Sequence, residues 1–286
     1  MDEARLLAAI SAVETAMRQQ TERDRARHQL RIDAIHAIAE RVNASYASEL
    51  AQLNARIEAR LLPVEPFRQS WNVFRVFEVE HQRARWTQWL GALLGPEHGS
   101  RCARVAWTAF CDAAARRAAK LPSVGSSGLA DASHWEAVAE EVPAVEHEAA
   151  DLLVTCPSMV ITIEVRLSDA SHTPAAAGRA IAENRLSINT QRRLGLVLLT
   201  PLEGLEHEPA DYIQVSWRDL GQALRRALRN EWSYEQQAVV DLWPIILTLV
   251  SIEQDLLDFA LPPGGSGNLN TQLKKLSELA SYLEER

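Results

Sequence analysis

Apolar side chains recur at steps of three and four residues along the first 62 residues, which contain neither glycine nor proline. This spacing places them on one side of a helix. The middle of the segment, "RQQTERDRARHQLR", is highly charged, so the pattern predicts either one very long helix or a helical hairpin bent near it. A stripe of this length is more often a coiled-coil or bundle contact than a ligand site. Its members are Leu6, Ile10, Val13, Met17, Ile35, Ile38, Val42, Tyr46, Leu50, Leu53, Ile57 and Leu61.

After Pro63 the pattern changes from one long helical segment to short mixed ones. Short apolar, β-branched runs predict strands, and "CPS" between the first two is a turn signal that predicts a hairpin. Helical spacing predicts helices between and around these strands. The strands are expected at 151–155, 159–165, 195–200 and 212–215, and the helices at 83–94, 101–120, 173–189, 216–230, 234–260 with a kink at Pro244, and 269–286.

This order predicts a mixed α/β fold with a sheet flanked by helices. We expect three parts: a helical or coiled-coil extension over 1–62, an α/β core over 63–230, and C-terminal helices over 231–286. "LPPGGSGN" before the last helix has the composition of a linker.

Composition narrows the possible environments of the chain. Of its 286 residues 47% are apolar, which is enough for a packed core, and the net charge is −8. The beginning of the sequence has no signal-peptide pattern, and the longest apolar run, 242–250, is too short for a bilayer. Three cysteines fit no metal-ligand spacing. We therefore expect a soluble cytoplasmic protein that does not enter membranes.

Charged residues stand within two of the expected strands. Asp151 begins the first strand of the hairpin, and Glu164 and Arg166 lie two apart on the second, so their side chains share a face. A charge inside a sheet is costly unless it is paired or binds a metal. Two carboxylates at strand ends suit Mg²⁺ or Mn²⁺, which can activate water for attack at phosphorus.

The arrangement Asp-x12-Glu-x-Arg on a hairpin followed by a helix resembles the PD-(D/E)XK nuclease superfamily. Within 71–230, "WNVFRVFEVEHQRARWTQWLGALLGPEHG" is similar to the leading helix of one prokaryotic branch. "LGLVLLTPLEG" and "YIQVSWRDL" are similar to its later strands. The resemblance implies a restriction-endonuclease-like core of order α-β-β-β-α-β.

The resemblance also implies roles for particular residues. Glu80, Asp151, Glu164 and Arg166 correspond to the catalytic set, with Asp151 and Glu164 as the metal ligands. Two departures stand out. Arg83 falls one turn closer to Leu93-Leu94, where the branch has its glutamate, and Arg166 replaces the lysine of the Glu-x-Lys triplet. An arginine stays protonated, so it can hold phosphate but cannot act as a general base.

Two functions follow, and they differ in class. The first is a metal-dependent nuclease that hydrolyses DNA, with phage defence as a biological role that such families commonly have. The second is a catalytically degenerate subunit that binds a partner or assembles through 1–62, as a homo-oligomer or with another protein. The sequence favours the nuclease narrowly, because both strand acids are present; a structural coiled-coil protein is a third possibility.

The position of one residue separates these functions. Glu80 pointing into the corner of Asp151 and Glu164 favours the nuclease, whereas Arg83 or Trp86 in that corner favours the subunit.

For a nuclease, four arginines are candidates for contacting the DNA backbone, although they fit a solvated helix face equally well. They are Arg179, Arg185, Arg192 and Arg193.

Overall fold

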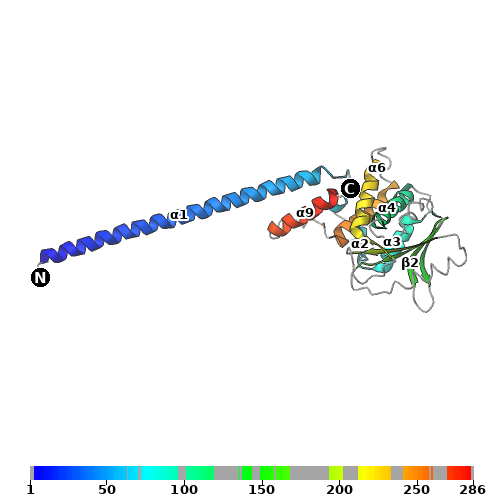
Figure 1. Ribbon diagram of the computed structural model, residues 1–286, viewed down its shortest axis with the longest axis horizontal. Helices are drawn as coiled ribbons and strands as arrows, with labels where there is room; N and C mark the ends of the chain where they lie inside the picture. Colours follow the sequence, from blue (N-terminus) through cyan, green and yellow to red (C-terminus); the bar gives the residue numbers. More distant parts are fainter. Residues whose placement is uncertain are drawn as a thin grey trace. The chain divides into compact units, whose positions relative to one another are not determined.

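The computed structural model describes most of the chain in segments (Figure 1). These are 3–62, 64–69, 72–95, 101–118, 135, 137–143, 149–157, 159–167, 193–201, 212–232, 241–257, 259 and 269–284. Within them, side chains are not described at 3–16, 67, 137–150, 193–194, 232, 269–270 and 272. The predicted helix 173–189 and the linker before the last helix lie outside the described residues.

The N-terminal unit, Met1–Ala59, is built on one helix. Helix α1 runs uninterrupted over Glu3–Glu58, so the charged middle of the segment continues the helix and does not form a hairpin bend. No glycine or proline interrupts it, and the charged residues there are mostly good helix formers. Five large apolar side chains of this helix are exposed: Met17, Leu30, Ile35, Ile38 and Val42.

The second unit, Arg60–Arg286, contains a five-stranded mixed sheet in the order β1-β2-β3-β4-β5. Strands β1 to β3 are antiparallel, whereas β4 runs parallel to β3 and β5 parallel to β4. The predicted hairpin is confirmed, and the four predicted strands are all present. The strands are β1 Ala137–Pro143, β2 Ala149–Thr155, β3 Met159–Val165, β4 Arg193–Thr200 and β5 Ile213–Ser216.

Strand β1 was not predicted from the sequence. Its sequence, "AVAEEVP", has two adjacent glutamates and ends in proline, so neither alternation nor β-branched content marks it as a strand. It pairs with β2 from Ala137 opposite Thr155 to Pro143 opposite Ala149. Its assignment as a strand therefore depends on its pairing with β2 in the folded sheet.

Helices supply the rest of the described second unit, which makes the chain a mixed α/β protein. Helices α3, α4 and α6 all contact strands of the sheet, and α4 and α6 pack against each other. Pro244 lies in the first turn of α8, a position where proline is tolerated, and residues 234–240 of the helix predicted around it lie outside the described residues. The helices are η1 Pro66–Arg68, α2 Val73–Val76, α3 Arg83–Leu94, α4 Arg101–Ala118, α6 Trp217–Trp232, α8 Trp243–Ser251, the π-helix η4 Ile252–Leu256 and α9 Leu269–Glu284.

The stretch that resembles one leading helix is divided into α2 and α3. Glu78 adopts a left-handed φ of 54° just after α2. The N–H of Val79 donates to the carbonyl of Phe74 at 2.9 Å, and the N–H of Glu78 donates to that of Arg75 at 3.1 Å. This is the hydrogen-bond pattern of a Schellman helix end. The chain therefore turns before α3 begins at Arg83.

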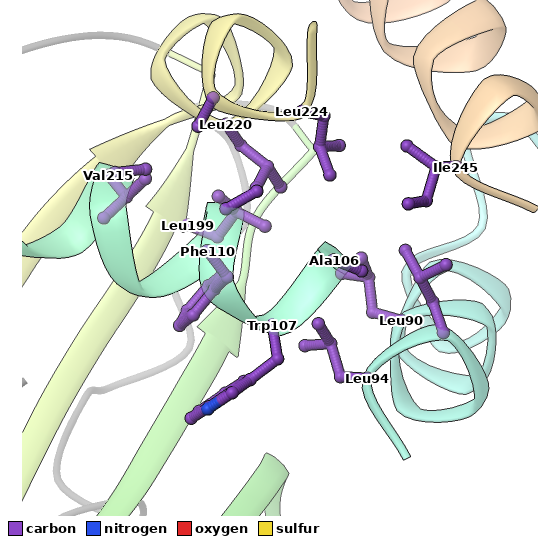
Figure 2. Packing of buried hydrophobic residues seen from close by; sticks show 14 of the residues in the cluster. Leu90, Leu94, Ala106, Trp107, Phe110, Leu199, Val215, Leu220, Leu224 and Ile245 are labelled. Carbon is purple, nitrogen blue, oxygen red and sulfur yellow. The ribbon is translucent and has the colours of Figure 1, made fainter. Parts of the chain in front are cut away.

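The core of the second unit lies between one face of the sheet and the helices. Figure 2 shows Trp107 and Phe110 of α4 among side chains of the sheet, such as Leu199, and of α6 and α8, such as Leu224 and Ile245. The indole of Trp86 lies 5.0 Å from that of Trp217 and is fully buried. Trp86 and Trp107 are thus core residues. No helix of the described segments is long and apolar enough to cross a bilayer.

Three charged residues and a tyrosine are buried together among the helices. We call this group the helix cluster: Glu65, Arg225, Glu253 and Tyr282. The guanidinium of Arg225 donates to both carboxylates, including 3.2 Å from Nη1 to Glu65 Oε2 and 2.7 Å from Nη2 to Glu253 Oε2. The Tyr282 hydroxyl donates to Glu253 Oε1 at 2.9 Å. This cluster ties together η1, α6, η4 and α9.

Candidate functional site at the ends of strands β2 and β3

Asp151 of β2 forms a forked ion pair with Arg83, the first residue of α3. Arg83 Nη2 donates to Oδ2 at 2.7 Å, and Arg83 Nε lies 3.1 Å from each carboxylate oxygen. Oδ2 also accepts the backbone N–H of Val165 at 2.7 Å. Paired, charge-assisted contacts of this kind are the strongest hydrogen bonds in proteins. They fix the Asp151 carboxylate between an arginine and the neighbouring strand.

Glu164 of β3 lies in the strand that pairs with β2. The register pairs Leu152 with Ile163, so Asp151 and Glu164 occupy the next position on their strands. Glu164 is only 5% exposed, and its Oε1 accepts the hydroxyl of Tyr212 at 2.9 Å. Asp151 and Glu164 therefore lie on adjacent antiparallel strands, as the hairpin predicts.

Burial governs the acidity of Glu164. It raises the pKa of the Glu164 carboxyl from 4.5 to about 6, against the hydrogen bond from Tyr212. The pKa of about 6 includes a smaller upward contribution from the Asp151 carboxylate and downward contributions from the cations Arg166 and Arg83. A carboxylate in such surroundings is still mostly ionised at neutral pH, but it holds a proton more readily than an exposed glutamate.

Arg166 follows β3 and is anchored through its backbone. Its N–H donates to the carbonyl of Leu199 at 2.8 Å, and its own carbonyl accepts Trp217 Nε1 at 2.8 Å. Arg166 is half-buried as a residue, and its positive charge is close enough to Glu164 to lower the pKa of that carboxyl. The structure therefore brings Asp151, Glu164 and Arg166 together, with Arg83 and Tyr212 as their partners. We call Arg83, Asp151, Glu164, Arg166 and Tyr212 the strand-end cluster.

Glu80, the fourth predicted catalytic residue, lies elsewhere. Its backbone carbonyl accepts Trp86 Nε1 at 2.9 Å. Burial raises the pKa of Asp255, and the negative charge of Glu80 is among the contributions that raise it. No three His, Cys, Asp or Glu residues of the described segments gather as a metal site would require. The turn after α2 separates Glu80 from α3, so Arg83 faces Asp151 in its place.

The carboxylates as arranged do not suit Mg²⁺ or Mn²⁺. Such an ion needs open carboxylate oxygens, usually from one or two protein carboxylates, and keeps several water ligands. Both oxygens of Asp151 are engaged by Arg83, and Oδ2 also accepts the Val165 N–H. Oε1 of Glu164 accepts Tyr212. A guanidinium thus holds the place beside Asp151 that a divalent cation would need, and a cation there would have to displace it.

Two members of the strand-end cluster were not predicted as site residues. Arg83 carries a signal in the sequence, because it falls where the similar nuclease branch has its glutamate. Tyr212 carries none, since it precedes the β5 run and looks like one more aromatic core residue. Its partnership with Glu164 depends on the parallel neighbours β3, β4 and β5 being side by side.

The predicted DNA contacts fall mostly outside the described residues. Arg179, Arg185 and Arg192 are not described. Arg193 begins β4 and pairs with Met159, but its side chain is not described. These contacts stay predictions.

No protein-family model, curated protein or solved structure matches the chain. The function is therefore inferred from its residues and their geometry.

Proposed function

We propose that this chain is a catalytically degenerate restriction-endonuclease-like subunit that acts in assembly through its N-terminal helix. One observation carries the proposal. The forked pair between Arg83 and Asp151, with contacts of 2.7 to 3.1 Å, supplies inside the protein the positive charge that a nuclease of this type takes from a metal. Arg83 is a permanent cation, whereas a metal exchanges with solvent.

The chemistry of the remaining residues supports the same function. Arg166 cannot accept a proton from water at physiological pH, and no lysine occurs between residues 121 and 273 to replace it. Glu164 hydrogen-bonds to Tyr212 in a buried position. An acid held by internal donors stabilises one arrangement of the strands, which is a structural role.

Helix α1 supports a role in assembly. Met17, Leu30, Ile35, Ile38 and Val42 expose apolar side chains along it, with exposed fractions between 46% and 68%. Long helices in water gain most of their stability by packing an apolar face. A second copy of the chain or another protein would cover this stripe, as in coiled coils.

Metal binding and cleavage test the degenerate site. Titration of the full chain with Mn²⁺ by calorimetry is expected to show weak or no binding, and plasmid DNA with Mg²⁺ or Mn²⁺ is expected to stay intact. Arg83→Gln should increase Mn²⁺ binding, because it exposes the Asp151 carboxylate. Arg85→Gln, two residues along the same helix and exposed, is the matched control.

An active nuclease should give the opposite results in these experiments. If the chain cleaves DNA with Mg²⁺ and Asp151→Asn abolishes cleavage while the protein stays folded, the degenerate-subunit proposal is wrong. In that case Arg83 would have to leave Asp151 when the metal binds.

Paired substitutions on α1 test assembly. Ile35→Glu with Val42→Glu places charges on the exposed stripe, whereas Ala37→Glu with Ala44→Glu places the same charges seven residues apart on another side of the helix. Light scattering should give an assembly larger than the 31.8 kDa monomer for the wild type and the Ala37/Ala44 variant. The Ile35/Val42 variant should be smaller or lose its protein partner. Equal masses and partners for both variants would contradict assembly through the stripe.

A further inference from the structure

A cationic groove of about 660 Å³ runs between helices α4 and α6 and shares no residue with the strand-end cluster. Four arginines line it, Arg101, Arg104 and Arg116 from α4 and Arg226 from α6, together with two acids, Asp112 and Glu231. The groove thus has two more positive than negative side chains, in a chain whose net charge is −8. Its volume is within the usual range of small-molecule sites.

The ion pairs inside the groove leave positive charge in excess. Asp112 is shared, since Arg226 Nη2 lies 3.0 Å and Arg116 Nε 3.1 Å from its carboxylate. Arg101 is paired with Glu231 at 2.6 Å. Arg104 is exposed and forms no ion pair with any residue in the described part of the chain. One carboxylate between two guanidiniums, together with the exposed guanidinium of Arg104, favours a bound anion.

The base of the groove is apolar and built from small side chains. Val105, Ala109, Ala223 and Ala227 line it, and the first three are buried. Small residues at these positions leave room between the two helices, while Thr108 and Asn230 add polar groups at its border. A ligand that fits this groove has an anionic end for the arginines and an apolar or flat body for the alanines.

We propose that the groove between α4 and α6 binds an organic phosphate, that is, a phosphoryl group attached to an apolar or planar body such as a nucleotide. Guanidinium groups match the geometry of phosphate oxygens and can contact two of them at once. The apolar base accounts for a preference over inorganic phosphate. The same chemistry is offered by a free nucleotide and by a nucleotide within a nucleic acid strand. This site does not depend on the proposed function of the strand-end cluster.

Binding is measured on the full chain by calorimetry with adenosine monophosphate, inorganic phosphate and adenosine, and by fluorescence anisotropy with a labelled 15-nucleotide oligothymidine. Adenosine monophosphate or the oligonucleotide should bind more tightly than inorganic phosphate or adenosine. Binding of the mononucleotide identifies a free nucleotide as the source, and binding of the oligonucleotide alone identifies a strand. Absence of binding by every phosphate probe overturns the proposal.

Two variants with opposite expected signs make the test sharp. Arg104→Ala should weaken binding about two- to fivefold, the effect of losing one exposed charged contact. Asp112→Asn should strengthen it by a similar factor, because Arg116 and Arg226 lose the carboxylate that competes with the ligand. Arg85→Ala, an exposed arginine on α3, is the matched control and should change nothing.

Other results would contradict the site. The proposal is wrong if Arg104→Ala and Arg85→Ala weaken binding equally, or if Asp112→Asn weakens binding in protein whose circular dichroism is unchanged. It is also wrong if an oligoglutamate peptide binds with Arg104 dependence while the phosphate probes do not, because the groove would then recognise an acidic protein segment.

Discussion

The strand-end cluster and the helix cluster use the same three residue types, acid, arginine and tyrosine, in different surroundings. In the helix cluster Arg225 is 4% and Glu253 0% exposed, and one arginine serves two carboxylates. In the strand-end cluster the Arg83 side chain is 30% exposed, and the cluster contains two arginines and two acids. In both clusters each carboxylate accepts at least one hydrogen bond from an arginine or a tyrosine.

The comparison bears on whether buried acidic residues indicate a catalytic site. The spacing of the strand-end acids resembles that of a nuclease site, whereas the residues of the helix cluster match no catalytic pattern considered above. Both clusters nevertheless consist of carboxylates that are hydrogen-bonded to arginine and tyrosine. Burial is tolerated in each because internal donors replace water around the carboxylates. Buried acids beside arginines are therefore insufficient evidence for catalysis. The predictions below test whether the helix cluster is the more costly of the two to disrupt.

Removing the shared cation of the helix cluster should have the largest effect. Arg225→Met leaves Glu65 and Glu253 buried without a positive partner, which should cost about 3–5 kcal/mol of the free energy of unfolding. Arg226→Met, the next residue on α6, is the control and should cost less than about 1 kcal/mol, because its partner Asp112 is 43% exposed. Urea unfolding followed by tryptophan fluorescence measures both. Equal losses would remove the distinction between buried and exposed pairs.

Gly221 tests how closely Tyr282 is packed into the helix cluster. A Cβ at Gly221 would lie 2.4 Å from the Tyr282 hydroxyl oxygen. Gly221→Ala should therefore destabilise the protein by about 1–3 kcal/mol, although the same change inside an unhindered helix stabilises by about 1 kcal/mol.

Combining Gly221→Ala with Tyr282→Phe identifies the cause of that loss. The double variant lacks the hydroxyl that the new methyl group meets, so the cost of Gly221→Ala should be smaller in the Tyr282→Phe background. Thermal unfolding of the four proteins completes the cycle. Additive changes would show that the contact with the hydroxyl is not the cause.

Glu164 should make stability depend on pH in the strand-end cluster. Its pKa is raised from 4.5 to about 6, so the folded state favours the protonated carboxyl. Its contribution to stability is therefore fully present below about pH 4.5 and is lost as the pH rises through about 6. The difference between 6 and 4.5 corresponds to about 2 kcal/mol.

The variant Glu164→Gln removes this titration. Between pH 4 and pH 8 the wild type should lose about 2 kcal/mol of unfolding free energy relative to Glu164→Gln. Glu278→Gln changes an exposed carboxylate on α9 and is the control for general effects of charge. If the curves of wild type and Glu164→Gln are parallel across this range, burial does not penalise the Glu164 carboxylate.

The hydroxyl of Tyr212 should give the smallest effect. Tyr212→Phe removes the donor to Glu164 and should cost about 1.5 kcal/mol at pH 8, the lower end for a hydrogen bond to a charged group. The cost should shrink near pH 4.5, because a protonated carboxyl needs that donor less. Tyr282→Phe, which removes the corresponding donor to Glu253 in the drier cluster, should cost more. The reverse order would contradict the comparison of the two clusters.

Local patterns in the sequence specify several helices and strands of this protein. Three- and four-residue spacing without glycine or proline specified α1, and β-branched runs around the "CPS" turn specified β2 and β3. The same hairpin fixed Asp151 and Glu164 on neighbouring strands. These features depend on residues close in the sequence, where spacing and turn chemistry act directly.

The partner of each charged residue, in contrast, depends on the complete fold. Arg83 and Asp151 are 68 positions apart, Glu164 and Tyr212 are 48 apart, and Glu65 and Arg225 are 160 apart. The turn at Glu78 directs Arg83 rather than Glu80 toward β2, and strand β1 exists through its pairing with β2. Hydrogen bonds and ion pairs act over a few ångströms, so residues distant in sequence pair only after the whole fold has brought them together.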